Sequence, residues 1–233
     1  MGCLHGHLSP FSQHTSYHLP PSITWNRASL SYRGSFQILV CFNKQCICPK
    51  ALTTAVASRS AIRLIDTHFM SSLEFTDPKH IYRVFDPNTP SYVGNASHEM
   101  DQNWDDLILP ADIHITDHEA ESLPSDAKLY RSPETGLYKI ELQVFHSLHC
   151  LNMIRMRVYA DQYPEMLADN ARVHVDHCID ALREVLMCEG NMTPLPIEWS
   201  KEGQRINPNY AQRHTCRDFD ALKTWTKARA AIM

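Results

Sequence analysis

Apolar residues recur at helical spacing in two long segments of the C-terminal half of the chain. The first segment predicts a helix near residues 140–160, and the second predicts a helix over about residues 171–188. The apolar face of the first is formed by Val144, Phe145, Leu148 and Leu151. The apolar stripe of the second is formed by Val175, Ile179, Leu182 and Leu186. Because Gly190 can adopt the left-handed conformation that ends a helix, the second helix is expected to stop there.

Shorter elements are predicted upstream of these two helices. Ser97 is suited to cap a short helix. The buried face of that helix is expected to be Trp104, Leu107 and Ile108. Residues 113–116 have the pattern of a short strand, and Thr116 with Glu119 fits a capping box that opens a helix over residues 117–123.

The remaining pattern completes a mainly α prediction with short extended or β segments. Residues 128–131 are expected to form one side of a hairpin, and residues 218–232 a last helix. Residues 1–73 are predicted to be an irregular or weakly ordered N-terminal extension, because Ser, Thr, Pro and His clusters interrupt their short apolar runs. Residues 74–233 are predicted to be a single compact domain built on the two long helices.

Composition and charge exclude several classes of protein. The chain has 233 residues, of which 43% are hydrophobic, so it can bury a sizeable core. Its net charge of −4 argues against nucleic acid and anionic membrane surfaces as partners. Neither an apolar run of about 18 residues nor an ordinary signal peptide is visible, so no membrane anchor is evident. Two triplets, at Asn95 and Asn191, are glycosylation acceptors if the chain enters the secretory pathway.

The chemistry concentrates in two copies of a His-x-x-His-Cys motif, one on each long helix. The first copy is His146, His149 and Cys150, and the second is His174, His177 and Cys178. Positions i, i+3 and i+4 lie on one face of a helix, so each motif directs two imidazoles to one side. If the helices pack together, four imidazoles converge, and imidazole is a good ligand for copper, iron and zinc.

The sequence allows several interpretations of this cluster of histidines and cysteines. The four histidines can close one metal site, or two pairs can each leave open positions for oxygen and substrate. Cys150 and Cys178 can be metal ligands, or they can be bonded to Cys188 and Cys216. In a simple hairpin the two motifs would be out of step by about eight residues, or roughly 12 Å of helix. For the motifs to meet, either the connection over residues 161–170 runs back by that distance or the helices cross at an angle.

Each of three further polar residues can be interpreted as structural or as functional. Arg155 and Arg183 are expected to form ion pairs, although either can hold a substrate carboxylate. His214 is expected to be a structural histidine, with a further metal ligand or a proton shuttle as the alternative.

These motifs and their flanks resemble the ustYa-like family of fungal secondary-metabolite oxidases. The segments that carry the resemblance are residues 145–155, 174–188, 92–94, 101–107 and 214–220. It implies an oxidase that cyclises, hydroxylates or halogenates a peptide-derived or small-molecule intermediate. It also implies a metal held by His146, His149, His174 and His177, with copper first and iron as runner-up.

The resemblance also implies a setting for the protein. Family members act in the secretory lumen or at a membrane, and a paralogous oxidase is an expected partner. The alternative is a non-catalytic module, stapled by a metal or by disulfides, that supports a biosynthetic oxidase complex. A third reading is a hydrolase that uses zinc-bound water, which would act without oxygen.

Overall fold

The computed structural model describes residues 40–42, 45–47 and 56–230 of the chain. The chain divides into two units, Met1–Leu52 and Thr53–Met233. In the first unit, β1 (Val40–Phe42) pairs with β2 (Gln45–Ile47) in an antiparallel hairpin.

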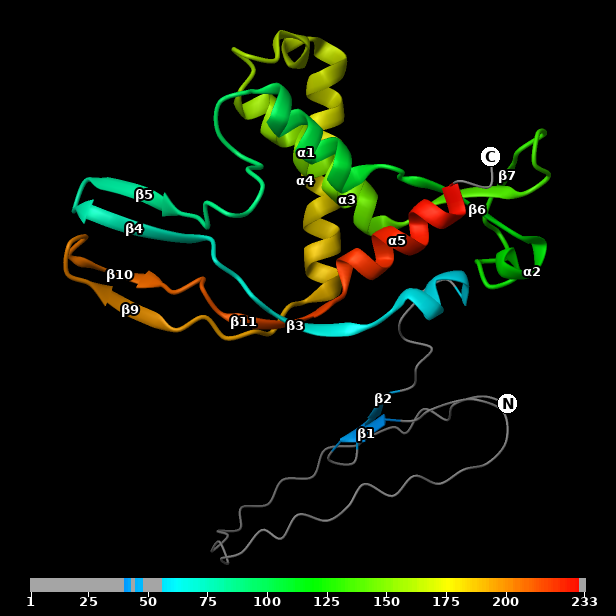
Figure 1. The fold of residues 1–233 in the computed structure, drawn as a ribbon, viewed down its shortest axis with the longest axis horizontal. Coiled ribbons are helices and arrows are strands. Elements are labelled where there is room, and N and C mark those ends of the chain that lie inside the picture. The colour runs from blue at the N-terminus through cyan, green and yellow to red at the C-terminus, as the bar shows by residue number, and fades with distance from the viewer. Residues whose placement is uncertain (1–39, 43–44, 48–55, 231–233) are drawn as a thin grey trace, which may run out of the picture. The chain divides into compact units, whose positions relative to one another are not determined.

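Helices and strands share the second unit (Figure 1). The α-helices are α1 (His98–Ile108), α2 (Asp117–Ala120), α3 (Gln143–Val158), α4 (Asp169–Glu189) and α5 (Phe219–Ala230). The 3-10 helices are η2 (Val56–Ala61) and η3 (Pro164–Leu167). The strands are β3 (Leu64–His68), β4 (Ser72–Asp77), β5 (His80–Val84), β6 (Asp112–Ile115), β7 (Tyr130–Arg131), β8 (Tyr138–Glu141), β9 (Ile197–Ser200), β10 (Arg205–Pro208) and β11 (Arg213–Arg217).

Local sequence explains where these helices begin and end. The Ser97 hydroxyl accepts a hydrogen bond from the backbone N–H of Met100 and caps α1. Thr116 and Glu119 form both bonds of the expected capping box at α2. Gly190 ends α4 with a φ of 50°, the left-handed conformation that glycine adopts without steric cost. These caps confirm the predicted helix starts and the predicted stop.

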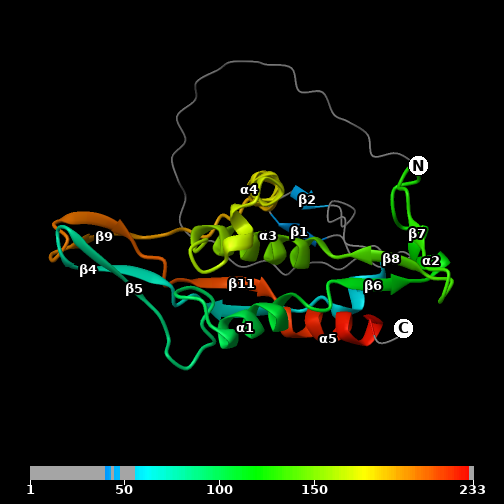
Figure 2. The same ribbon diagram turned by 90° about the horizontal axis from the view of Figure 1, so that it is seen from above.

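The strands form small antiparallel sheets instead of one large one. β6, β8 and β7 make a three-stranded sheet, and β3 pairs with β11 over their full lengths. β4 pairs with β5, and β9 pairs with β10. The last two hairpins lie side by side and extend away from the helices, as both views show (Figures 1 and 2). We call these two hairpins the arm.

The core lies between the helices and the small sheets. One cluster centres on Ile113 and Ile115 of β6, which pack against Trp225 of α5. A second contains Met100, Trp104 and Ile108 of α1 and touches Leu148 of α3. A third joins Tyr163, Met166 and Val175 beneath the connection between α3 and α4.

The prediction of a mainly α fold is wrong in its emphasis, because the unit is a mixture of α and β structure. The strands over residues 64–84 and 197–217 were missed because each is only 4 to 6 residues long, so an alternation such as that of Leu73 with Phe75 or Ile197 with Trp199 repeats too few times to stand out. The predicted division at residue 73 stays a prediction, although β3 lies before it and pairs with β11. Within the described residues, no helix is both long and apolar enough to span a bilayer.

Candidate metal centre

The four motif histidines come together between α3 and α4, which pack against each other. The rings of His146 and His177 lie 5.7 Å apart between centroids, and those of His149 and His174 lie 5.4 Å apart. Within one helix the separations are 6.4 Å for the first motif and 6.3 Å for the second. The rings therefore form a four-cornered cluster, and each short edge joins one helix to the other.

The connection between the helices makes this register possible. His146 lies opposite His177 and His149 lies opposite His174, so α3 and α4 run antiparallel. α3 continues nine residues past His149, whereas α4 begins five residues before His174. The remaining difference of four residues, about 6 Å of helix, is taken up by η3 and the turns around it. Tyr163 and Met166 fix that connection by packing against Val175.

The cluster divides into two cross-helix pairs that are not equivalent. His146, Cys150 and His177 each offer a ligand atom, and these atoms lie within 4.8 Å of one another. The Cys150 sulfur lies 3.8 Å from Nε2 of His146. The pair of His149 with His174 has no third side chain of this kind among the described residues. The first pair thus has a soft sulfur donor in reach, and the second has imidazoles alone.

Burial and charge favour the neutral, metal-binding form of His149. Three of the histidines are half-buried, and His177 is exposed. Burial lowers the pKa of His149, and the neighbouring charges of His174 and His146 lower it further. A lowered pKa keeps the ring neutral, and neutral imidazole is the ligand. The rings of His149, His174 and His177 make no hydrogen bond or ion pair within the described part of the chain. Their nitrogen atoms are therefore free for a ligand.

The cysteines behave differently from the histidines. Cys150 and Cys178 are fully buried, and both are free thiols, as are Cys188 and Cys216. Burial raises the pKa of Cys178 to about 12, helped by a hydrogen bond with Cys150, so its thiol stays protonated. Neither Cys150 nor Cys178 forms a disulfide with Cys188 or Cys216. Cys178 and Cys188 lie ten residues apart on α4, about 15 Å along the helix, which is beyond the reach of a disulfide.

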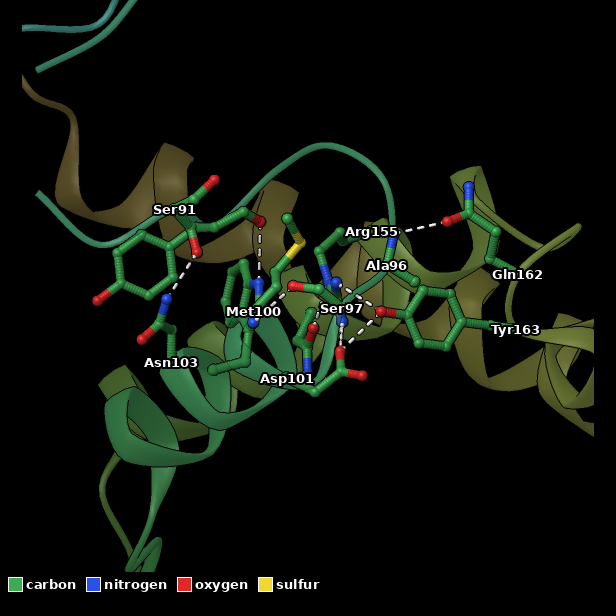
Figure 3. Close-up of polar contacts among 12 residues, drawn as sticks. Ser91, Ala96, Ser97, Met100, Asp101, Asn103, Arg155, Gln162 and Tyr163 are labelled. Atoms are coloured by element: carbon green, nitrogen blue, oxygen red, sulfur yellow. Dashed lines mark hydrogen bonds and ion pairs between the residues drawn. The ribbon is translucent and has the colours of Figure 1, made fainter. Parts of the chain in front are cut away.

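A second polar cluster lies on the opposite side of α3, against α1 (Figure 3). The buried Arg155 guanidinium donates to Asp101 Oδ1 at 2.8 Å, to Tyr163 Oη at 2.9 Å and to Asn152 Oδ1 at 2.7 Å. Tyr163 also donates to Asp101 at 2.7 Å. Burial raises the pKa of Asp101, but the bonds from Tyr163 and Arg155 outweigh it and leave that pKa lowered. We call this group the Arg155 cluster.

The Arg155 cluster confirms the expected ion pair and shows what it does. It joins α1, α3 and the connection before η3, and each of the three nitrogen atoms of the Arg155 side chain donates a hydrogen bond. The expected pairing of Arg183 is also confirmed, with Asp180 at 2.7 Å, but there both side chains are exposed. His214 is buried and stacks on Phe69 with ring centroids 3.8 Å apart. It lies on β11, outside the four-histidine cluster.

One acidic residue beside the cluster was missed in the sequence. Glu141 ends β8 and lies five residues before His146. Burial raises the pKa of its carboxyl group, and the charge of His146 acts in the opposite direction. A carboxylate five residues ahead of the first predicted ligand, His146, is the signal that could have found it, because a single residue joins the end of β8 to the start of α3.

Fold and site together define a protein with a candidate histidine metal centre held between two antiparallel helices. The model of the family described as mycotoxin biosynthesis protein UstYa matches residues 12–229, so the chain belongs to the UstYa family. This confirms the resemblance that the motifs indicated. No solved structure matches the chain.

Several curated proteins are similar to parts of this chain. The UstYa family oxidase phomYd from Diaporthe leptostromiformis is 34% identical over 145 residues, which cover 60% of this chain and 47% of phomYd. The UstYa family oxidase VicYc from Bipolaris victoriae is 36% identical over 93 residues, which cover 40% of this chain and 93% of VicYc. The transacylase cctO from Talaromyces islandicus is 30% identical over 198 residues, which cover 75% of this chain and 64% of cctO. The chain thus spans about half the length of phomYd.

Proposed function

We propose that this protein is a metal-dependent oxidase of fungal secondary metabolism, acting on a peptide-derived or small-molecule intermediate. The observation that carries the proposal is the cluster of four imidazoles from two copies of one motif. Curated relatives that are named as oxidases support it. Cyclisation, hydroxylation and halogenation are all oxidations that such a site can serve.

The donor set fits a transition metal. Imidazole nitrogen with one thiol in reach suits copper or iron, whereas magnesium and calcium prefer oxygen ligands. His146 and His177 would hold one ion, with Cys150 beside them, and His149 and His174 would hold another or complete the same site. When bound, such an ion supplies redox chemistry with molecular oxygen. Copper is the metal to test first.

The protein's own residues orient the site and handle protons. The α3–α4 packing fixes the distance between the two members of each cross-helix pair. Cys178 is fully buried and does not belong to the group of His146, Cys150 and His177 whose ligand atoms lie close together, so we assign it a packing role. The Glu141 carboxyl group, with its raised pKa and its proximity to His146, is suited to accept a proton at the edge of the site.

Metal analysis combined with reconstitution tests the proposal. The purified chain is stripped with a chelator, loaded with copper, iron or zinc, and assayed for metal content and oxygen consumption with candidate substrates. We expect a metal that binds in stoichiometric amount and oxygen uptake only in the copper or iron form. Metal-independent activity, or activity that is unchanged without oxygen, would overturn the proposal.

The same preparation separates an enzyme from an accessory module. If the metal only staples the fold, His146→Ala or His174→Ala should lower the melting temperature in parallel with function. For an oxidase, activity should be lost while the melting temperature stays close to that of the wild type.

Acyl transfer is a second candidate function, because one relative is named a transacylase and Cys150 lies against His146. A thiol beside an imidazole is the arrangement of a nucleophile and its base. Burial of Cys150 opposes this reading, since an acyl donor could not reach the sulfur without movement of α3 or α4. Acyl transfer predicts activity without metal or oxygen and its loss in Cys150→Ser.

A further inference from the structure

A pocket of about 500 Å³ lies at the base of the arm, where the chain enters and leaves the two hairpins. Its walls come from the link between β3 and β4, the segment before β9 and the segment between β10 and β11, and β11 contributes His214. The rest of the lining is mainly apolar and consists of Phe69, Leu73, Leu195 and Tyr210, together with Ser71 and Ser72. This volume and this lining are typical of sites that bind small molecules.

His214 is a buried polar side chain in this lining, and its hydrogen bonding is incomplete. It is 8% exposed, and its Nε2 atom, which is shielded from solvent, has no hydrogen-bond partner in the described part of the chain. The ring stacks on Phe69, and β11 is paired with β3 along its whole length, so the imidazole is held in place. A buried polar atom without a partner raises the free energy of the folded state, so such an atom indicates a position where a partner binds.

The contacts of Asn191 fix which nitrogen of His214 carries the proton. Oδ1 of Asn191 accepts a hydrogen bond from the backbone N–H of Thr193 at 2.9 Å, which turns the amide nitrogen toward the imidazole. That nitrogen lies 3.5 Å from Nδ1 of His214. Because an amide nitrogen can only donate, we assign Nδ1 as the acceptor and place the proton of the neutral ring on Nε2. The unpartnered atom is therefore an N–H donor that lacks an acceptor.

Two aromatic side chains of the lining can move to admit a ligand. Phe69 is 44% exposed and Tyr210 is 38% exposed, and both lie in connections between strands. Rotation of either side chain removes little buried contact, whereas His214 stays fixed on β11. A ligand that enters the pocket can therefore reach the Nε2 atom by displacing an exposed ring.

We propose that this pocket binds an apolar ligand through a carbonyl oxygen, which accepts a hydrogen bond from Nε2 of His214. The carbonyl supplies the acceptor that this nitrogen lacks, and the apolar walls shield the bond from water. A peptide carbonyl beside an aromatic side chain and a ketone on an aromatic small molecule share this chemistry. His214 lies on β11, outside the imidazole cluster of α3 and α4, so the inference does not rest on the proposed function.

Binding is measured on the full, metal-free chain by NMR titration with benzylacetone, an aromatic ketone, as the probe. We expect a Kd below about 1 mM for the ketone. The corresponding primary amine has the same carbon skeleton but is protonated and presents only donors, so it should bind at least about tenfold more weakly.

The variant His214→Phe keeps a ring against Phe69 and removes the donor. It should weaken ketone binding at least about tenfold, while its melting temperature stays within about 2 °C of the wild type or rises, because a buried unpartnered atom is lost. His118→Phe is the matched control, since His118 is an exposed histidine of α2, and it should leave ketone binding unchanged.

Three further measurements sharpen the assignment. Long-range proton–nitrogen NMR spectra of the imidazoles should place the His214 proton on Nε2. Leu195→Trp fills the pocket from a connection outside the strands, so it should abolish ketone binding with His214 intact. N-acetyl-L-phenylalanine amide is titrated alongside benzylacetone. Tighter binding of the amide assigns the pocket to a peptide segment, and the reverse order assigns it to a ketone of another kind.

Other results would overturn the proposal. Equal affinity for the ketone and the amine, or full ketone binding by His214→Phe, would show that no carbonyl bonds to His214. Absence of ketone binding at about 10 mM would show that the pocket takes no such ligand. A proton on Nδ1, or a clear fall in melting temperature in His214→Phe, would make His214 a structural residue. All of these measurements are made without metal or turnover, so a failure of the oxidase proposal would leave them unaffected.

Discussion

The two faces of α3 carry polar clusters of opposite character. Toward α1, each nitrogen atom of the Arg155 side chain has a partner, in Asp101, Tyr163 or Asn152. Toward α4, the imidazoles of His149, His174 and His177 have neighbours but no hydrogen bonds. Interior polar groups normally find partners, so the first cluster is explained by the fold alone. The second has no such explanation in the contacts of the described residues, and this difference separates a structural network from a candidate site.

The largest expected effect comes from removing one ligand. His177→Ala should lower oxidase activity by about 10³-fold or more and reduce bound metal, while the melting temperature stays within about 2 °C. His177 is exposed and makes no hydrogen bond, so its loss leaves no cavity. Activity, metal content and calorimetry check this. His118→Ala is the control, since His118 is an exposed histidine on α2. A large fall in melting temperature in His177→Ala alone would show that the imidazole cluster is structural after all.

The reverse pattern is expected on the other face of α3. Arg155→Met should lower the free energy of unfolding by about 3 kcal/mol, because it leaves Asp101 and Tyr163 without their buried partner. Urea titration of the metal-free chain measures this. Lys139→Met, which breaks the exposed pair with Asp112, should change stability by less than about 1 kcal/mol. Equal effects of the two variants would contradict the distinction between the clusters.

A third polar contact, between Arg229 and Glu119, makes the stability of the fold depend on pH. Hydrogen bonding with Arg229 of α5 lowers the pKa of Glu119 to about 2, although burial opposes the shift. The unfolded carboxyl group titrates near 4.3, so this stabilisation is complete above about pH 5 and is lost as the pH falls toward 2. Glu119→Gln should remove about 2 kcal/mol at pH 7 and flatten the acid limb of the stability curve. Glu121→Gln, at an exposed site, should preserve that limb.

The smallest expected effect tests the end of α4. Gly190→Ala should destabilise the chain by about 1 kcal/mol, because φ is positive there and the added Cβ meets nothing closer than 3.9 Å. Gly190→Asn should recover part of that loss, since asparagine tolerates the left-handed region better than alanine. Thermal unfolding of the two variants side by side gives the answer. An alanine variant as stable as the wild type would mean that the helix can end elsewhere.

The helices and the motif pairing could be predicted from the sequence, because both are local properties. A 3.6-residue period fixed which side chains of α3 and α4 share a face, and Ser97, Thr116 and Gly190 marked the helix ends. The convergence of the two motifs required only that these faces meet. The convergence could therefore be predicted from the sequence, although the register between α3 and α4 could not.

The arm and the Arg155 cluster could not be predicted, because they depend on contacts between distant residues. Asn207 of β10 donates to the Leu73 carbonyl of β4 across 134 positions of the chain, and Arg155 reaches Asp101 from 54 residues away. The prediction that the apolar stripe of α4 is buried failed at Ile179 and Leu186 for a related reason. Helical periodicity indicates that a face will be covered but does not tell what covers it, and Ile179 and Leu186 remain exposed within this chain.

The cross-helix pairing also means that the candidate site exists only when α3 and α4 are packed together. Each short edge of the imidazole quadrilateral takes one ring from each helix, so neither motif alone reproduces either pair. A nascent chain that has emerged only as far as the first motif has nothing to complete a pair, and a partly unfolded chain that separates α3 from α4 loses both at once. Under the proposed function, a metal ion would therefore bind only after the two helices have docked, and redox chemistry would be confined to the assembled site.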